Sequence, residues 1–164
     1  MKGVRRRAPP TAARAFDPRV VYEPASQRWF ASSAADAGVP RKPHPTAVSN
    51  TSDPTQGWQA ISISGDPTGQ FSADFPMLGV NEDGVFTVAN MFVGGTNQLS
   101  SEKVIAIPKA DLLQPVPTAV NATVVDNGLR PIRDPFPIPP SHFNHLDPNR
   151  SFLRTMIIWA APPP

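Results

Sequence analysis

The chain of 164 residues contains no cysteine. Disulfide scaffolds, thiolate metal sites and cysteine nucleophiles are therefore excluded. The sequence also lacks an uninterrupted apolar run of roughly 18 residues, so we predict no membrane span. The N-terminal residues lack the apolar stretch of roughly 7 to 15 residues that a secretory signal needs, and we predict no signal peptide within this chain.

Charged side chains are also scarce, at 17% of residues with a net charge of +2, against roughly 25% in ordinary globular chains. Five basic residues gather before position 15, namely Lys2, Arg5, Arg6, Arg7 and Arg14. No basic stripe interleaved with aromatics follows them, so we predict no nucleic-acid partner. Residues 1–16 are predicted to be a disordered basic lead-in.

Proline is abundant instead, at 22 of 164 residues, against roughly 5% in average chains. Because proline removes a backbone donor, this proline-rich chain must form short strands and few helices. Short segments of alternating apolar and polar residues, such as 59–64, indicate strands. We therefore predict an all-β fold.

Two stretches, 17–30 and 74–86, share one plan of an Asp, a short apolar strand, a polar turn and a second strand with an aromatic residue. Asp17 and Asp74 are 57 residues apart. The predicted strands are 19–22, 28–33, 46–50 and 59–64 in the first unit, and 77–80, 85–91, 103–107 and 119–125 in the second. A helical turn is predicted at 108–113, and Asp83-Gly84 predicts a type I′ hairpin turn.

Four-stranded units that recur every 40 to 60 residues or so are typical of β-propeller blades. We predict a partial propeller over 17–164, with blades at 17–73 and 74–128 and a half blade at 141–160. Known rings use roughly four to eight blades, so this one needs further blades or a partner chain to close. The alternative is a two-sheet β-sandwich whose hairpins resemble one another by chance.

The segment from Thr51 to Trp58, Thr-Ser-Asp-Pro-Thr-Gln-Gly-Trp, falls between the third and fourth predicted strands. It resembles the Asp box of sialidases, which reads Ser/Thr-x-Asp-x-Gly-x-Thr-Trp. Thr51, Asp53 and Trp58 match, while Thr55 and Gly57 exchange the family's Gly and Thr. We interpret Thr51, Asp53, Gly57 and Trp58 as a structural motif in which the Asp accepts turn N–H groups and the Trp packs on the sheet. No second copy is expected.

Over residues 17 to about 125 the pattern also resembles sialidase-like propellers of secreted bacterial proteins. The resemblance implies an extracellular or periplasmic location. The tyrosine nucleophile and glutamate of sialidases do not transfer, because Tyr22 and Glu23 are adjacent in a predicted strand and face opposite sides. Tyr22 is predicted to be a core aromatic.

Asp17 and Asp74 precede the first predicted strand of each unit, which would be innermost in a propeller. There they could contact a glycan or protein ligand, hold a cation such as calcium through oxygen atoms, or act as paired acids of a glycosidase if about 5 to 9 Å apart. Asn90 is a further candidate ligand contact. The preferred interpretation is that both carboxylates accept hydrogen bonds at the strand entry.

His142 and His145, followed by Asp147, have a spacing that can chelate a metal, but on a strand the two histidines face opposite sides. We assign no metal site, no catalytic residue and no cofactor, apart from the cation that Asp17 and Asp74 could hold in the central channel of a propeller. The predicted function is a non-catalytic propeller scaffold that binds a glycan or protein. The alternative is part of a glycan-active hydrolase with Asp17 and Asp74 near the channel.

Overall fold

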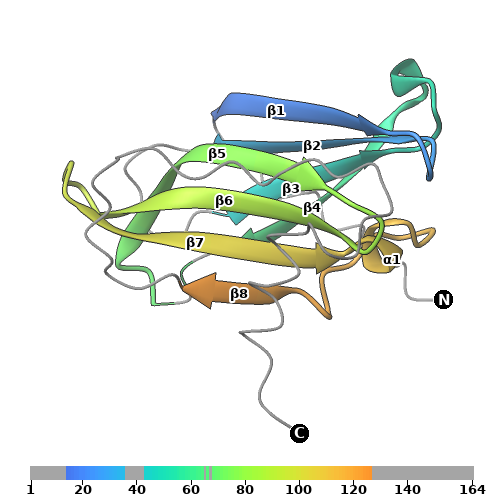
Figure 1. Ribbon diagram of the computed structural model, residues 1–164. Helices are drawn as coiled ribbons and strands as arrows, with labels where there is room; N and C mark the ends of the chain where they lie inside the picture. The colour runs from blue at the N-terminus through green and yellow to red at the C-terminus, as the bar shows by residue number, and fades with distance from the viewer. Residues whose placement is uncertain (1–13, 36–42, 65, 67, 127–164) are drawn as a thin grey trace, which may run out of the picture.

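The computed structural model describes residues 14–35, 43–64, 66 and 68–126. These residues form two four-stranded antiparallel sheets, which confirms the all-β prediction (Figure 1). The first sheet contains β1 (Ala15–Glu23), β2 (Arg28–Ala35), β3 (Pro43–Ser49) and β4 (Trp58–Ser64). The second contains β5 (Phe71–Val80), β6 (Gly84–Val93), β7 (Leu99–Pro108) and β8 (Thr123–Asp126). In each sheet every strand pairs with the next one along the chain.

Every strand predicted before residue 127 overlaps an observed one. β1 begins at Ala15, so residues 15 and 16 belong to the sheet and not to the predicted lead-in. Both loops that follow a third strand contain a helical turn: η1 (Pro54–Gln56) after β3 and α1 (Lys109–Leu112) after β7. The predicted half blade at 141–160, with His142, His145 and Asp147, lies outside the described residues.

The first strand of each sheet carries the same β-bulge. In β1 the register shifts between Phe16 and Arg19, and in β5 between Asp74 and Met77, so one extra residue is inserted in each strand. The residue before the proline of each bulge has a positive φ, 50° at Asp17 and 51° at Phe75. Such values are costly for residues with a side chain, and the same strain therefore recurs in both sheets.

This register corrects the predicted offset between the units. The prolines of the two bulges, Pro18 and Pro76, are 58 residues apart. Asp17 therefore corresponds to Phe75, and Asp74 corresponds to Phe16. The two aspartates lie inside β1 and β5, where we had expected them to precede the strands. Asp17 and Asp74 are the same residue type, but they do not occupy equivalent positions of the repeated backbone.

The hairpin turns confirm the offset of 58, because Glu23 and Asn81 close them in the same way. The Glu23 carboxylate accepts hydrogen bonds from the backbone N–H groups two and three residues on, at 3.1 and 2.9 Å. Asn81 Oδ1 accepts from the equivalent groups at 2.9 and 2.8 Å. Both turns are thus closed by a side chain at the end of the preceding strand, which accepts hydrogen bonds from the backbone of the turn.

The predicted type I′ turn at Asp83-Gly84 is wrong. Gly84 begins β6 and is not among the glycines with positive φ. A Cβ atom at this position would lie 3.0 Å from the Ile107 carbonyl oxygen and 3.1 Å from the Phe86 ring. Gly84 is therefore required by close packing in the sheet, and the Asn81 side chain closes the turn.

The hydrophobic core lies between the two sheets. We call the side of the first sheet that contributes to it the inner face, and the contributing side of the second sheet the near face. The inner face supplies Val21, Phe30, Val48, Ile61 and Ile63, and the near face supplies Leu78, Val80, Val85, Ile105 and Ile107. The sheets approach most closely where β1 and β2 meet β5. There Arg19 Nε donates to the Pro76 carbonyl oxygen at 3.1 Å.

The two sheets pack head to tail. By the offset of 58, Phe30 of the inner face corresponds to Val88, which lies on the side of the second sheet away from the core, the far face. Conversely, Leu78 and Val80 of the near face correspond to Val20 and Tyr22, which lie on the outer face of the first sheet. Opposite faces of the repeated unit therefore meet in the core.

Candidate functional site

The structure places the three predicted ligand contacts in two different sheets. Asp74 lies directly opposite Asn90 in the β5–β6 ladder, while Asp17 belongs to the other sheet. Asp17 and Asp74 are exposed and Asn90 is buried. The Asp74 carboxylate accepts the Phe75 N–H at 2.8 Å, which stabilises the strained bulge. The hydrogen bond lies inside β5 and not at the strand entry, where we had expected it.

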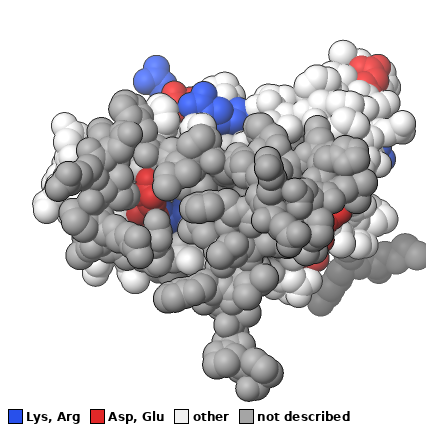
Figure 2. Space-filling view, in the orientation of Figure 1, with Lys and Arg blue, Asp and Glu red and all other residues white. Residues whose placement is uncertain are grey.

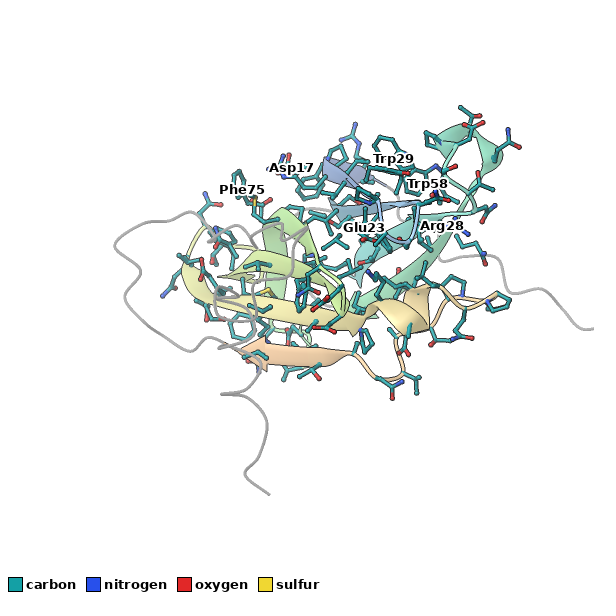
Figure 3. All side chains as sticks on the ribbon, turned by 45° about the vertical axis from the view of Figure 1, so that its right-hand side comes forward. Asp17, Glu23, Arg28, Trp29, Trp58 and Phe75 are labelled. Carbon is teal, nitrogen blue, oxygen red and sulfur yellow. The ribbon has the colours of Figure 1, made fainter. Side chains whose placement is uncertain are left out.

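The bulges of the two sheets are close to each other. The Arg19 guanidinium lies 5.4 Å from the centre of the Phe75 ring, in a cation–π contact. Figure 3 shows Asp17 and Phe75 at the same end of the molecule. Across the described ranges no cluster of three histidine, aspartate or glutamate side chains is suited to a metal ion. Within the same ranges no helix is long and apolar enough to cross a membrane.

The segment from Thr51 to Trp58 is a closed loop between β3 and β4, and the hydrogen bonds of Asp53 lie within it. Asp53 accepts from the Thr55 N–H at 2.9 Å and from the Thr55 hydroxyl at 2.7 Å. These bonds lower the pKa of Asp53. Gly57 has a φ of 93°, and a Cβ there would lie 2.9 Å from Asn50 Nδ2. The loop geometry is thus that of a structural turn.

A second copy of this turn, which the sequence analysis missed, joins the two sheets. The segment from Ser64 to Phe71 shares with the first loop the pattern Ser/Thr-x-Asp-Pro-Thr-x-x-aromatic. Asp66 accepts from the Thr68 N–H at 2.9 Å and the Thr68 hydroxyl at 2.6 Å, as Asp53 does from Thr55. In both copies the first hydroxyl donates to the carbonyl of the Asp, at 3.0 Å from Thr51 and 2.9 Å from Ser64.

Asp66 is buried, in contrast to Asp53. Its carboxylate also accepts the N–H groups of Gln70 and Phe71, at 2.6 and 2.8 Å. Burial alone would raise the pKa of Asp66, but the hydrogen bonds from Thr68, Phe71 and Gln70 outweigh it and lower the pKa. The charged carboxylate fixes the start of β5. A search by spacing outside the equivalent loop of the second unit would have found this copy.

A buried ion pair connects the hairpins of the two sheets. Lys109 Nζ lies 3.3 Å from Glu23 Oε2 and donates to the Asn81 carbonyl oxygen at 3.0 Å. Both side chains of the pair are nearly inaccessible to solvent. Burial opposes ionisation of Glu23, yet the hydrogen bonds from Ser26 and the charge of Lys109 outweigh it and lower the pKa. Lys109 therefore holds together the two equivalent turns, and the sequence analysis did not anticipate it.

A buried histidine lies in the first sheet. His44 is on β3, opposite Ile63 of β4, and is only 2% exposed. Burial lowers its pKa to about 4. Its Nδ1 atom has no hydrogen-bond partner among the described residues. His44 is thus a neutral core side chain at physiological pH.

The outer face of the first sheet carries a row of aromatic residues. Tyr22, Trp29, Ser49 and Trp58 are neighbours in successive strands and share one face. Tyr22 is 36% exposed and is not the core aromatic we predicted. Its ring centre lies 5.0 Å from that of Trp29. Figure 3 shows Trp29 and Trp58 on the same side of the sheet.

Both indole N–H groups of this row are already satisfied within the chain. Trp29 Nε1 donates to the Ser52 carbonyl oxygen at 3.0 Å, and Trp58 Nε1 donates to the Pro54 carbonyl oxygen at 2.8 Å. The rings are therefore fixed against the β3–β4 loop. In the view of Figure 2 the described surface is mainly uncharged, with acidic and basic atoms in small separate groups.

No protein-family model matches the chain, and no curated protein or solved structure matches it.

Proposed function

We propose that this chain is a non-catalytic binding and structural scaffold, made of two consecutive blades of an incomplete β-propeller. A location outside the cytoplasm is part of this proposal and rests on the resemblance of residues 17 to about 125 to sialidase-like propellers of secreted bacterial proteins. The scaffold role rests on the hydrogen bonds of four described acidic residues, which stabilise the fold. Glu23, Asp53, Asp66 and Asp111 each accept hydrogen bonds within their own turns or loops.

The observation that supports the propeller is the head-to-tail contact between the sheets. In a sandwich formed by two related sheets about a two-fold axis, equivalent faces would meet, as in an isologous interface. In a radial or stacked array each unit presents opposite faces to its two neighbours. Phe30 lies in the core while its counterpart Val88 lies on the far face, and this observation supports the second arrangement.

The hydrolase alternative requires two carboxylates placed as a pair. Asp17 and Asp74 occupy different positions of the repeat, and the Asp74 carboxylate binds the backbone of its own bulge. Asp17 is instead matched by Phe75, a residue without acid–base chemistry. These observations favour the scaffold over paired-acid catalysis.

Methyl and aromatic nuclear Overhauser effects test the arrangement directly. We expect contacts from the Phe30 ring to the methyl groups of Leu78 and Val80. Contacts to Val88 and Val104 in their place would mean that equivalent faces meet, and would overturn the propeller.

Turnover of a panel of aryl glycosides tests the scaffold role. We expect none from the wild-type chain, and we expect the Asp17→Asn and Asp74→Asn variants to melt at temperatures close to that of the wild type. Turnover that Asp74→Asn abolishes, without loss of the fold, would establish the hydrolase alternative.

A further inference from the structure

We propose that the outer face of the first sheet is a docking surface for another four-stranded antiparallel sheet, which presents to it a face like the inner face. This proposal rests on the head-to-tail arrangement above and names the partner that the arrangement requires. The surface consists of Val20, Tyr22, Trp29 and Trp58, with Ala31, Ala47 and Ala60 between them.

The second sheet shows what the outer face is built to do. Through the offset of 58, Val20 corresponds to Leu78, Tyr22 to Val80 and Trp29 to Thr87. Leu78 is 4% exposed and Val80 1%, because the inner face of the first sheet covers them. Val20 is 54% exposed. The same positions of the repeat are thus covered in one sheet and open in the other.

The chemistry of the outer face suits burial against protein. The seven residues named above carry no charge, so covering them removes no ionised group from water. The indole N–H groups of Trp29 and Trp58 keep their bonds to Ser52 and Pro54 when the rings are covered. Burial of the aromatic rings therefore gains apolar contact without leaving an unsatisfied donor.

The same comparison defines the face that the partner must present. The inner face combines one large ring, Phe30, with Val48, Val21 and two isoleucines, and it covers the near face of the second sheet. Among the described residues, a second copy of this chain has no such face to offer. Its inner face is already in its own core, and Val88 and Val104 of its far face are buried as well. The occupant is therefore a further sheet of the repeat, from the same polypeptide or from another chain.

A tandem chain tests the surface. Residues 14–70, which include the natural connection between the sheets, are placed directly before Arg14 of the full chain. Trp29→Phe and Trp58→Phe are introduced in the added copy and Trp159→Phe in the full chain, so that only the outer-face indoles of the full chain fluoresce. We expect their quenching by acrylamide to fall severalfold relative to the unextended chain that carries Trp159→Phe.

Substitutions on the full chain provide matched controls. Val20→Lys on the outer face should restore quenching in the tandem chain. Val116→Lys should not, because Val116 is exposed in the β7–β8 loop, away from this face. Hydrogen exchange of the added copy is measured in parallel. Indoles that stay fully quenchable overturn the proposal, whether the added copy is protected or not.

Two further outcomes would assign the surface to another occupant and overturn the proposal. One is a dimer of the unextended chain in sedimentation experiments that Val20→Lys dissociates. The other is retardation of the unextended chain in gels containing hydroxyethylcellulose that Trp58→Ala removes. The Overhauser contacts between Phe30 and Val80 are measured inside the unextended chain, so a failed docking test leaves the proposed head-to-tail arrangement standing.

Discussion

The two sheets of this protein share a plan but differ in their surroundings. The first sheet buries its inner face and leaves aromatic residues exposed on the other. The central strand β6 of the second sheet is buried on both sides from Gly84 to Met91. Their turns differ as well, since Glu23 closes one with a charge and Asn81 closes the other without. Backbone features such as the bulge and the turn are thus retained, while the side chains follow the neighbours that each sheet has.

Among the equivalent positions, the turn residues Glu23 and Asn81 should differ most in their contribution to the free energy of unfolding. Glu23→Ala removes the turn acceptor and also leaves Lys109 buried without its partner, so we expect a loss of about 4 kcal/mol in the free energy of unfolding. Asn81→Ala removes only neutral hydrogen bonds and should cost about 2 kcal/mol. Urea unfolding of both variants measures the difference. Equal losses would show that Lys109 does not depend on Glu23.

Mild acid should destabilise the first sheet more than the second, because the buried His44 belongs to the first sheet. The unfolded histidine takes up a proton near its ordinary pKa of 6.5, but the folded one does so only at about 4. The stability is therefore complete above pH 6.5 and is lost as the pH falls, by about 2 kcal/mol at pH 5 and about 3 kcal/mol at pH 4. Hydrogen exchange and urea unfolding at pH 7 and 5 measure this loss.

His44→Leu is the control for this pH dependence, and it should flatten the decline between pH 6.5 and 5. The carboxylates Glu23 and Asp66, whose pKa values are lowered, add their loss only below their ordinary values of 4.5 and 3.8. A decline that His44→Leu leaves unchanged would contradict the assignment.

The two Asp-Pro-Thr turns differ in their place in the fold. The turn at Asp53 is a loop within the first sheet, and the turn at Asp66 connects the two sheets. Asp66 is buried and accepts two more backbone N–H groups than Asp53. We expect Asp66→Asn to cost about 2 kcal/mol. Asp53→Asn, at an exposed site, should cost clearly less. Thermal melts with hydrogen exchange at the start of β5 provide the measurement, and a larger effect at Asp53 would be inconsistent with this structure.

The bulges should give the smallest effects. Asp17 and Phe75 both have a φ near 50°, which glycine adopts without strain. Asp17→Gly should stabilise the fold by up to about 1 kcal/mol. Phe75→Gly should gain less or lose stability, because it also removes the ring beneath Arg19. Calorimetry of both variants decides, and destabilisation by Asp17→Gly would mean that the carboxylate has a structural partner.

Sequence reasoning located the strands because alternation and turn residues are local signals. It placed the helical turn after β7 and the closed loop at Asp53 for the same reason. The offset between units was wrong by one residue because Asp17 was matched to Asp74 by identity. The register is set by the bulge before Pro18 and Pro76.

Contacts between the sheets could not be predicted in the same way. The Glu23–Lys109 pair joins residues far apart in the chain, and its attraction depends on burial that only packing creates. Tyr22 was assigned to the core because alternation shows which residues share a face but not which face is covered. Asp66 was missed although its pattern is visible, because the search was limited to the equivalent loop of the second unit.

The bulge with its proline is also expected to hinder the addition of another strand at the edge of each sheet. β1 and β5 are edge strands, and an edge strand with free N–H groups is a template on which another chain can add a strand. Pro18 and Pro76 remove a donor from each of these edges, and the extra residue bends the strand at the same point. Two of the many prolines of this chain thus stand where they oppose strand addition, at one edge of each sheet.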